Sequence, residues 1–112
     1  MPTSQAIAST TPIPLWITPK HMKGKLKALI IDNQHTEAAT IIIQDVFTPD
    51  PSIGNQSPTQ QIKIRVQITV GAGTSISLDR TALEGVEFLG VASAVSNVTS
   101  TSCVIIAVYD LE

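Results

Sequence analysis

The sequence predicts an all-β protein: an antiparallel, jelly-roll-like β-sandwich of six to eight strands with an extended, proline-rich arm at its N-terminus. Three observations predict this fold. Residues 61–70 alternate strictly between apolar and polar side chains, which is the period of a strand with one buried face. Strand-like segments recur about every ten residues and are separated by turn residues. No segment longer than a single turn has the pattern of a helix.

The segment Gln61–Val70 is the clearest strand of the sequence. Every second residue from Ile62 to Val70 is apolar, so a regular strand would place all of these side chains on one face. The polar face would consist of Lys63, Arg65, Gln67 and Thr69. Because the chain beyond residue 31 is otherwise acidic, we predict that Lys63 and Arg65 contact an acidic partner.

Further strands are predicted at residues 25–32, 39–47, 75–78, 86–94 and 103–109. In the first of these, Leu26, Ala28 and Ile30 would share one face. The turn residues 33–37 join it to the second strand, and we expect the two to form a hairpin. The last two strands are apolar at nearly every position, which predicts central strands covered on both faces. Residues 79–85 have the cap and stop residues of one helical turn.

Residues 1–23 are predicted to form the extended arm, and residues 24–112 a single sandwich domain. Three prolines within eight residues of the arm fix φ and remove backbone donors, which favours extended chain over a central strand. The arm also holds the only tryptophan, within the apolar run Leu15, Trp16 and Ile17. Such a segment either folds back over its own sandwich or lies on a neighbouring subunit. We favour the neighbour, which makes these three residues candidate interface residues.

The composition indicates a chain with little surface charge. Charged residues make up only 14% of the 112 residues, compared with about 25% in typical soluble domains. The shortage predicts that other subunits cover part of the surface. The alternative is a polar surface built from Ser, Thr and Gln. Residues 1–31 carry four lysines and no acid, whereas residues 32–112 carry nine acids against three basic residues, a distribution that would suit head-to-tail docking.

The residues that support catalysis or metal binding are scarce. The two histidines, His21 and His35, do not have zinc-ligand spacing. Cys103 is the only cysteine, and its apolar strand predicts a buried, inert thiol. Neither a phosphate-binding glycine loop nor a nucleophile elbow is present in the sequence. We therefore predict that the protein is not an enzyme and uses no cofactor or metal.

The lysine-rich segment at residues 20–27 is the main candidate for binding phosphates. It lacks the interleaved aromatic residues that stack on bases, and a solvated strand edge explains its lysines equally well. Nucleic acid is therefore an unlikely partner. The sequence also lacks an 18-residue apolar run and the pattern of a signal peptide, so we expect neither membrane insertion nor secretion through a signal peptide.

Residues 48–59 form the longest predicted loop and contain three prolines and one glycine. Loops of this length in compact domains are usually functional or disordered. The alternative function is therefore a ligand- or glycan-binding sandwich that uses this loop. Against it, sugar-binding sandwiches display rows of exposed aromatic side chains, and aromatic residues make up only 4% of this chain.

The order of the segments is the feature that can be compared with known proteins. A strand ending at Asp32-Asn33 is followed by Ala39–Asp45, a proline-rich loop, the alternating strand, the short segment Ser75–Asp79, and strands at 85–91 and 104–109. This order resembles that of small β-sandwich proteins of tailed-phage particles and related capsids, of the decoration (cement), neck or tail-associated type. The family offers no catalytic residues to transfer.

The resemblance covers about residues 24–112 and implies an assembly role. Such proteins form symmetric homo-oligomers, with trimers or hexamers favoured, and dock on a larger capsid or tail assembly through arms and exposed faces. It also implies a location in the virion after assembly in the host cytoplasm. We therefore expect a non-enzymatic structural protein. Its predicted interface residues are Leu15, Trp16, Ile17, Lys63 and Arg65.

Overall fold

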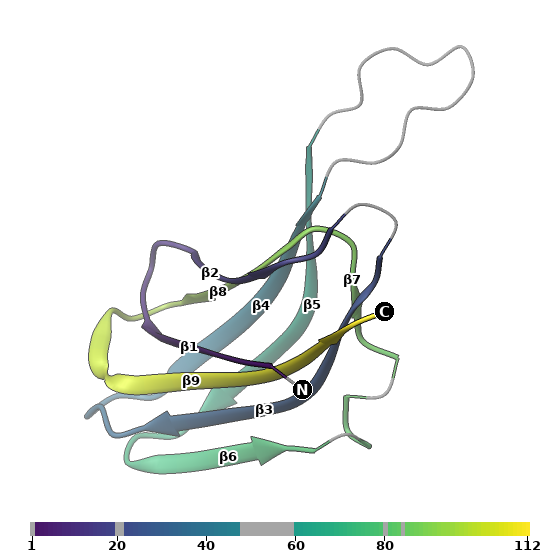
Figure 1. Cartoon of the computed structure of the whole chain (residues 1–112). Helices are drawn as coiled ribbons and strands as arrows, with labels where there is room; N and C mark the ends of the chain where they lie inside the picture. Colours follow the sequence, from purple (N-terminus) through teal and green to yellow (C-terminus); the bar gives the residue numbers. More distant parts are fainter. Residues whose placement is uncertain (1, 20–21, 48–59, 80, 84) are drawn as a thin grey trace.

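The chain folds into two antiparallel β-sheets that pack on a shared core (Figure 1). The computed structural model describes residues 2–19, 22–47, 60–79, 81–83 and 85–112, and within these ranges it contains strands and no helix. The strands are β1 (Thr3–Ala8), β2 (Ile13–Ile17), β3 (Gly24–Asn33), β4 (Ala39–Phe47), β5 (Gln61–Val70), β6 (Thr74–Leu78), β7 (Glu87–Phe88), β8 (Val91–Ser96) and β9 (Ser100–Leu111). The predicted all-β, antiparallel class is confirmed.

The strands divide into two sheets of similar width. Sheet A has the order β1-β9-β3-β6, and the short strand β7 also pairs with β3. Sheet B has the order β2-β8-β4-β5. The predicted strand 103–109 lies within β9, which is central in Sheet A as predicted. The predicted strand 86–94 is instead divided between β7 in Sheet A and β8, which is central in Sheet B. The described residues contain more strands than the six to eight predicted, because the N-terminal segment adds β1 and β2 and the segment before β8 adds β7.

The core lies between the sheets and is built mainly from β-branched and leucine side chains. Its largest fully buried members are Phe88, Leu26, Leu29, Ile31, Ile41, Ile43 and Ile105. The prediction that Leu26, Ala28 and Ile30 share a face is wrong, because the pairing of β3 with β9 shifts by one residue between Leu26 and Ala28. This bulge turns Leu29 and Ile31 inward in place of their neighbours.

The predicted hairpin of β3 and β4 is also wrong, because the two strands belong to different sheets. The side chain of Asn33 is buried at the point where the chain crosses from one sheet to the other. Its Nδ2 donates to the carbonyl oxygens of Val70 (3.0 Å) and Gly71 (3.2 Å), and its Oδ1 accepts the N–H of His35 (3.1 Å). One amide thus ties the β3–β4 connection to the β5–β6 connection.

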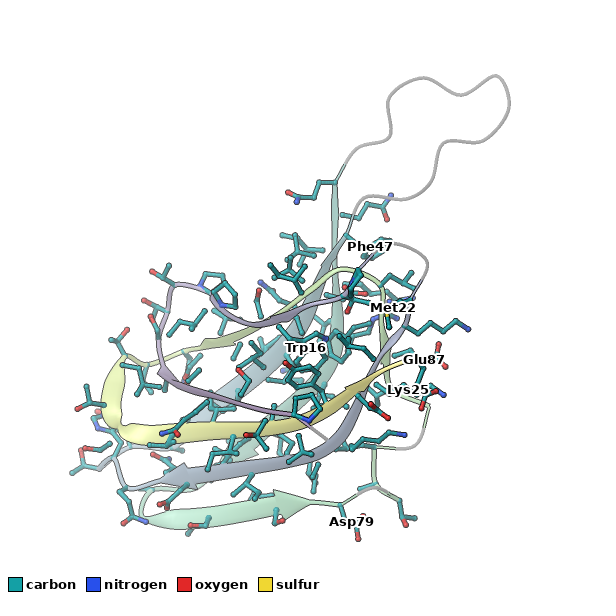
Figure 2. The ribbon with its side chains drawn as sticks, in the orientation of Figure 1. Trp16, Met22, Lys25, Phe47, Asp79 and Glu87 are labelled. Carbon is teal, nitrogen blue, oxygen red and sulfur yellow. The ribbon has the colours of Figure 1, made fainter. Side chains whose placement is uncertain are left out.

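The N-terminal segment is extended, as predicted, but it lies on its own chain. β1 pairs with β9 and β2 pairs with β8. Leu15 and Trp16 are buried in the core, and Figure 2 shows Trp16 between the two sheets. The Trp16 ring stacks on Tyr109 (centroids 4.4 Å apart) and meets the ring of Phe88 edge-on (5.0 Å). The arm that reaches a neighbour is therefore not confirmed: these aromatic contacts hold the segment in its own fold.

Candidate functional site

A bulge divides β5 into two halves that face in opposite directions. Val66 pairs with Ile43 of β4, whereas Ile64 pairs with the next residue, Gln44, so Arg65 is the extra residue. Beyond the bulge Val66 packs against the core, as the pattern predicts. Before it, the pairing places Ile62 and Ile64 on the outer face of Sheet B, where they are 64% and 54% exposed. The prediction that all the apolar residues of this strand share one face is therefore wrong.

The bulge brings Arg65 to a buried carboxylate. Strand alternation on β4 sends Asp45 into the interior, where its side chain is fully buried. Its Oδ2 accepts hydrogen bonds from Arg65 Nη2 and from the N–H of Leu89, each at 2.9 Å. Its Oδ1 accepts the N–H of Gly90, also at 2.9 Å. Because a buried charge is costly without partners, turning Arg65 toward Asp45 stabilises the interior at this point.

Gly90 can approach the backbone of β4 this closely because glycine has no Cβ. A Cβ on Gly90 would lie 2.2 Å from the carbonyl oxygen of Val46 and 2.9 Å from Cα of Phe47. The turn before β8 therefore docks directly on the end of β4. Asp45 then fastens this turn, and with it β8, to β4 and β5.

The outer face of Sheet B carries a row of apolar side chains. Ile17 pairs with Val91, Val91 with Val46, and Val46 with Ile62, so one residue from each of the four strands stands in the same line. Paired residues on antiparallel strands point to the same face, about 5 Å apart. Ile17 is 69% exposed. We call these four residues, together with Ile64 in the adjacent line, the outer apolar row.

The rest of this face is uncharged. Its remaining apolar members, Ile42 and Val95, pair with each other and are partly buried. The other outward positions of Sheet B in the described residues are occupied by Ser, Thr, Gln and Pro, and none by a charged residue. The face is therefore uncharged over all four strands, and its apolar side chains lie in the outer apolar row and in the Ile42–Val95 pair.

The outer face of Sheet A exposes its large apolar side chains less, and it carries charge. Its most exposed large apolar side chains, Ile7 and Ile30, are 39% and 36% exposed. The line that contains Ile7 and Val104 ends in Asp32 and Ser75. The carboxylate of Asp32 accepts hydrogen bonds from the side chains of Gln34 and Ser75, and these bonds lower its pKa. Sheet B therefore exposes its isoleucine side chains more fully than Sheet A does, and its outer face lacks a charge like that of Asp32.

Of the five predicted interface residues, three have partners within their own chain and two are exposed. Leu15 and Trp16 are buried in their own chain, and Arg65 is the partner of Asp45, so these three choices are corrected. Ile17 and Lys63 are exposed, and Ile17 belongs to the outer apolar row. The sequence reasoning missed the other members of that row. The signal that could have revealed them is Asp45, an acid at an inward position that requires a cation from a neighbouring strand.

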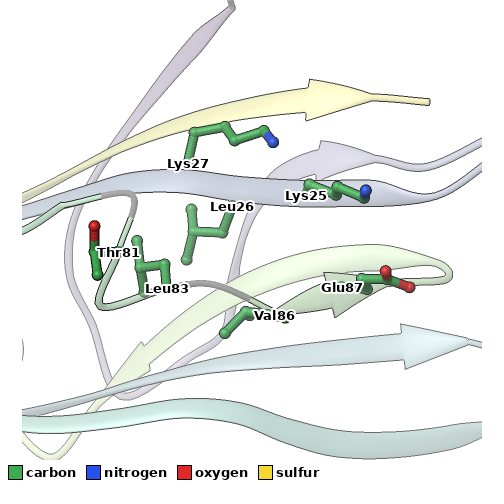
Figure 3. Close-up of a pocket in the computed structure, with 8 residues that line it drawn as sticks. Lys25, Leu26, Lys27, Thr81, Leu83, Val86 and Glu87 are labelled. Carbon is green, nitrogen blue, oxygen red and sulfur yellow. The ribbon is translucent and has the colours of Figure 1, made fainter.

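A pocket of about 540 Å³ lies beside the first residues of β3 (Figure 3). Its lining residues are Lys25, Leu26, Lys27, Thr81, Leu83, Gly85, Val86 and Glu87. Glu112 carboxylate oxygens lie 2.8 Å from Lys25 Nζ and 3.9 Å from Lys27 Nζ, and the hydrogen bond and charge of Glu112 raise the pKa of Lys25. Lys23 pairs with Glu87 at 3.6 Å. These lysines of the basic segment thus have acidic partners in their own chain.

The described residues contain no group of three or more His, Cys, Asp or Glu side chains that could hold a metal ion. Cys103 is buried, and burial raises the pKa of its thiol. No helix that could span a membrane occurs in the part of the chain that the structure describes.

No protein-family model matches the chain, and no match was found among curated proteins or solved structures. The function must therefore be inferred from the geometry of the chain itself.

Proposed function

We propose that the protein is a non-enzymatic structural subunit that works by packing against copies of itself within a larger assembly. The observation that carries this proposal is the outer apolar row. Ile17 and Ile62 stand at the two ends of a continuous line and are each about two-thirds exposed. Single exposed apolar residues are common on soluble proteins, but a contiguous row across four strands is typical of an interaction surface.

We further infer that the two sheets form a jelly roll. The strand orders support this inference: β1, β9, β3 and β6 form one sheet, and β2, β8, β4 and β5 form the other. Each of the connections β1–β2, β3–β4, β5–β6 and β8–β9 passes from one sheet to the other. Apart from the two-residue strand β7, each sheet has four strands, and two four-stranded sheets wound in this way are the jelly-roll arrangement, which occurs in viral capsid proteins, lectins and cupins.

We propose that the larger assembly is a virion. In it the protein would be a capsid decoration or a tail or neck component. The supports for this proposal are the order of segments in the sequence, the jelly-roll winding and the low content of charged residues. The likeness of fold is an analogy and names no reaction. The competing hypothesis of a glycan-binding module depends on residues 48–59, which lie outside the described residues, so it stays a prediction from the sequence.

The test of this proposal is the mass of the full chain in solution. Residues 1–19 contain two strands of the core, so a truncated chain would not answer the question. Sedimentation velocity between about 1 and 100 μM covers the affinities expected for a specific interface. We expect a species of several times the 11.9 kDa chain mass whose population rises with concentration. A single 11.9 kDa species at every concentration would contradict the proposal.

A further inference from the structure

We propose that the partner of the Sheet B outer face is the same face of a second copy, stacked across a two-fold axis. This inference rests on the proposed function and names the surface and the partner that it uses. The alternative way for β-proteins to associate is the addition of a strand at a sheet edge. The described edges and faces of this chain favour stacking over strand addition.

The edges of both sheets carry features that disfavour strand addition. β5 has the bulge at Arg65, and Lys63 stands beside it on the inward-facing side, opposite Asp45. β2 contains Pro14, which cannot donate a backbone hydrogen bond, and the pairing of β2 shifts immediately after it. In Sheet A, β1 has a shift after Ile7, and β6 is only five residues long. Bulges, edge prolines, inward-pointing lysines and short strands are known protections against edge pairing.

The Sheet B outer face has the properties of a self-complementary surface. It is neutral, so a strongly charged partner would find no opposite charge on it. In a two-fold contact the same patch is used by both subunits, so an apolar row on one copy meets an apolar row on the other. Sheets that pack face to face are separated by about 10 Å, a distance that side chains of isoleucine and valine fill.

The planar size of the face lies between that of a typical crystal-packing contact and that of a standard interface. Four strands spaced about 4.8 Å apart and rising about 3.4 Å per residue give Sheet B a planar footprint of about 500 Å². Protruding side chains add accessible area to this footprint. A standard interface buries about 800 Å² on each partner, and most crystal-packing contacts bury less than about 400 Å² on each.

The two-fold contact also limits which symmetric oligomers the chain can form. A cyclic trimer contains only head-to-tail contacts, whereas a hexamer of two stacked trimers contains two-fold contacts between them. A cyclic trimer alone therefore cannot contain the proposed Sheet B contact. A simple dimer satisfies the same contact.

The test places a charge at each end of the outer apolar row. Ile17→Lys lies on the edge strand β2, and Ile62→Lys lies on the opposite edge strand β5. Stacking involves both edges, whereas strand addition at β5 would involve only Ile62. We expect each variant to weaken self-association by about 30-fold or more in sedimentation velocity. The matched control is Ser77→Lys, an exposed outward position on β6 of Sheet A, which should leave the association constant unchanged.

Circular dichroism and thermal melting of each variant establish that its fold is intact. If the wild-type chain assembles and neither Ile17→Lys nor Ile62→Lys weakens assembly, the inference is overturned while the proposed function stands. Loss of assembly in Ile62→Lys alone would assign the contact to the β5 edge and would also overturn stacking. A wild-type chain that is monomeric at every concentration would remove the proposed function itself.

Discussion

Replacement of Asp45 by alanine is expected to lower the free energy of unfolding by about 3–5 kcal/mol, the usual cost of removing one partner of a buried ion pair. The substitution would leave the Arg65 guanidinium, whose side chain is only 19% exposed, without its carboxylate. It would also leave the N–H groups of Leu89 and Gly90 without their acceptor. Arg65 Nε already lacks a hydrogen-bond partner among the residues that the structure describes, so these residues offer little compensation. Urea denaturation monitored by circular dichroism measures the change.

The control for this experiment is Asp32→Ala, which removes a carboxylate from the outer face of Sheet A. Its hydrogen-bonding partners, Gln34 and Ser75, are exposed side chains that water can satisfy. We expect a much smaller loss of stability than in Asp45→Ala. A double-mutant cycle with Arg65→Ala should show strong coupling to Asp45. Equal effects of the two aspartate substitutions, together with no coupling to Arg65, would contradict a structural role for the buried pair.

Replacement of Trp16 by alanine is expected to cost about 3–5 kcal/mol of unfolding free energy, as for other large aromatic residues in a core. Trp16 is 5% exposed, stacks on Tyr109, and donates from Nε1 to the buried Thr18 Oγ1 at 3.1 Å. Its loss would open a cavity between the two sheets and detach β2 from the core. Urea denaturation of the variant gives the free energy directly.

The adjacent residue supplies the control for Trp16. Ile17 points to the opposite face of β2 and is mostly exposed, so Ile17→Ala should change the unfolding free energy by no more than about 0.5 kcal/mol. The two substitutions also distinguish the structure from the interpretation of this segment as a free arm. If Trp16→Ala weakened assembly and left the stability of the monomer unchanged, the tryptophan would be an anchor in a neighbour.

The class of the fold follows from local features of the sequence. Strand period and turn residues are properties of short segments, so the strand at residues 61–70 and the central position of β9 could be predicted. Whether two successive strands pair depends on contacts elsewhere. The amide of Asn33 bonds to the carbonyl of Val70, 37 residues away, and no local pattern records that contact.

The candidate surface could be predicted only in part for the same reason. Ile17 was identified from the apolar run around the tryptophan. Strict alternation predicts that Ile62 and Ile64 face the core because it does not reveal the bulge, and Asp45, the partner of the bulged Arg65, lies on another strand. Trp16 was assigned to a partner because its own partners, Phe88 and Tyr109, are far away in the sequence.

The most direct test of the central claim is to measure how exposed the isoleucine methyl groups are in the assembled full chain. A soluble paramagnetic compound broadens methyl resonances in proportion to their contact with solvent. In a single chain Ile17 and Ile62 are more exposed than Ile7, at 69% and 64% against 39%. Stacking of Sheet B predicts the reverse order in the assembly, with Ile17 and Ile62 broadened less than Ile7. Broadening that is strongest at Ile17 and Ile62 in the assembled protein would contradict the claim that this face is the interface.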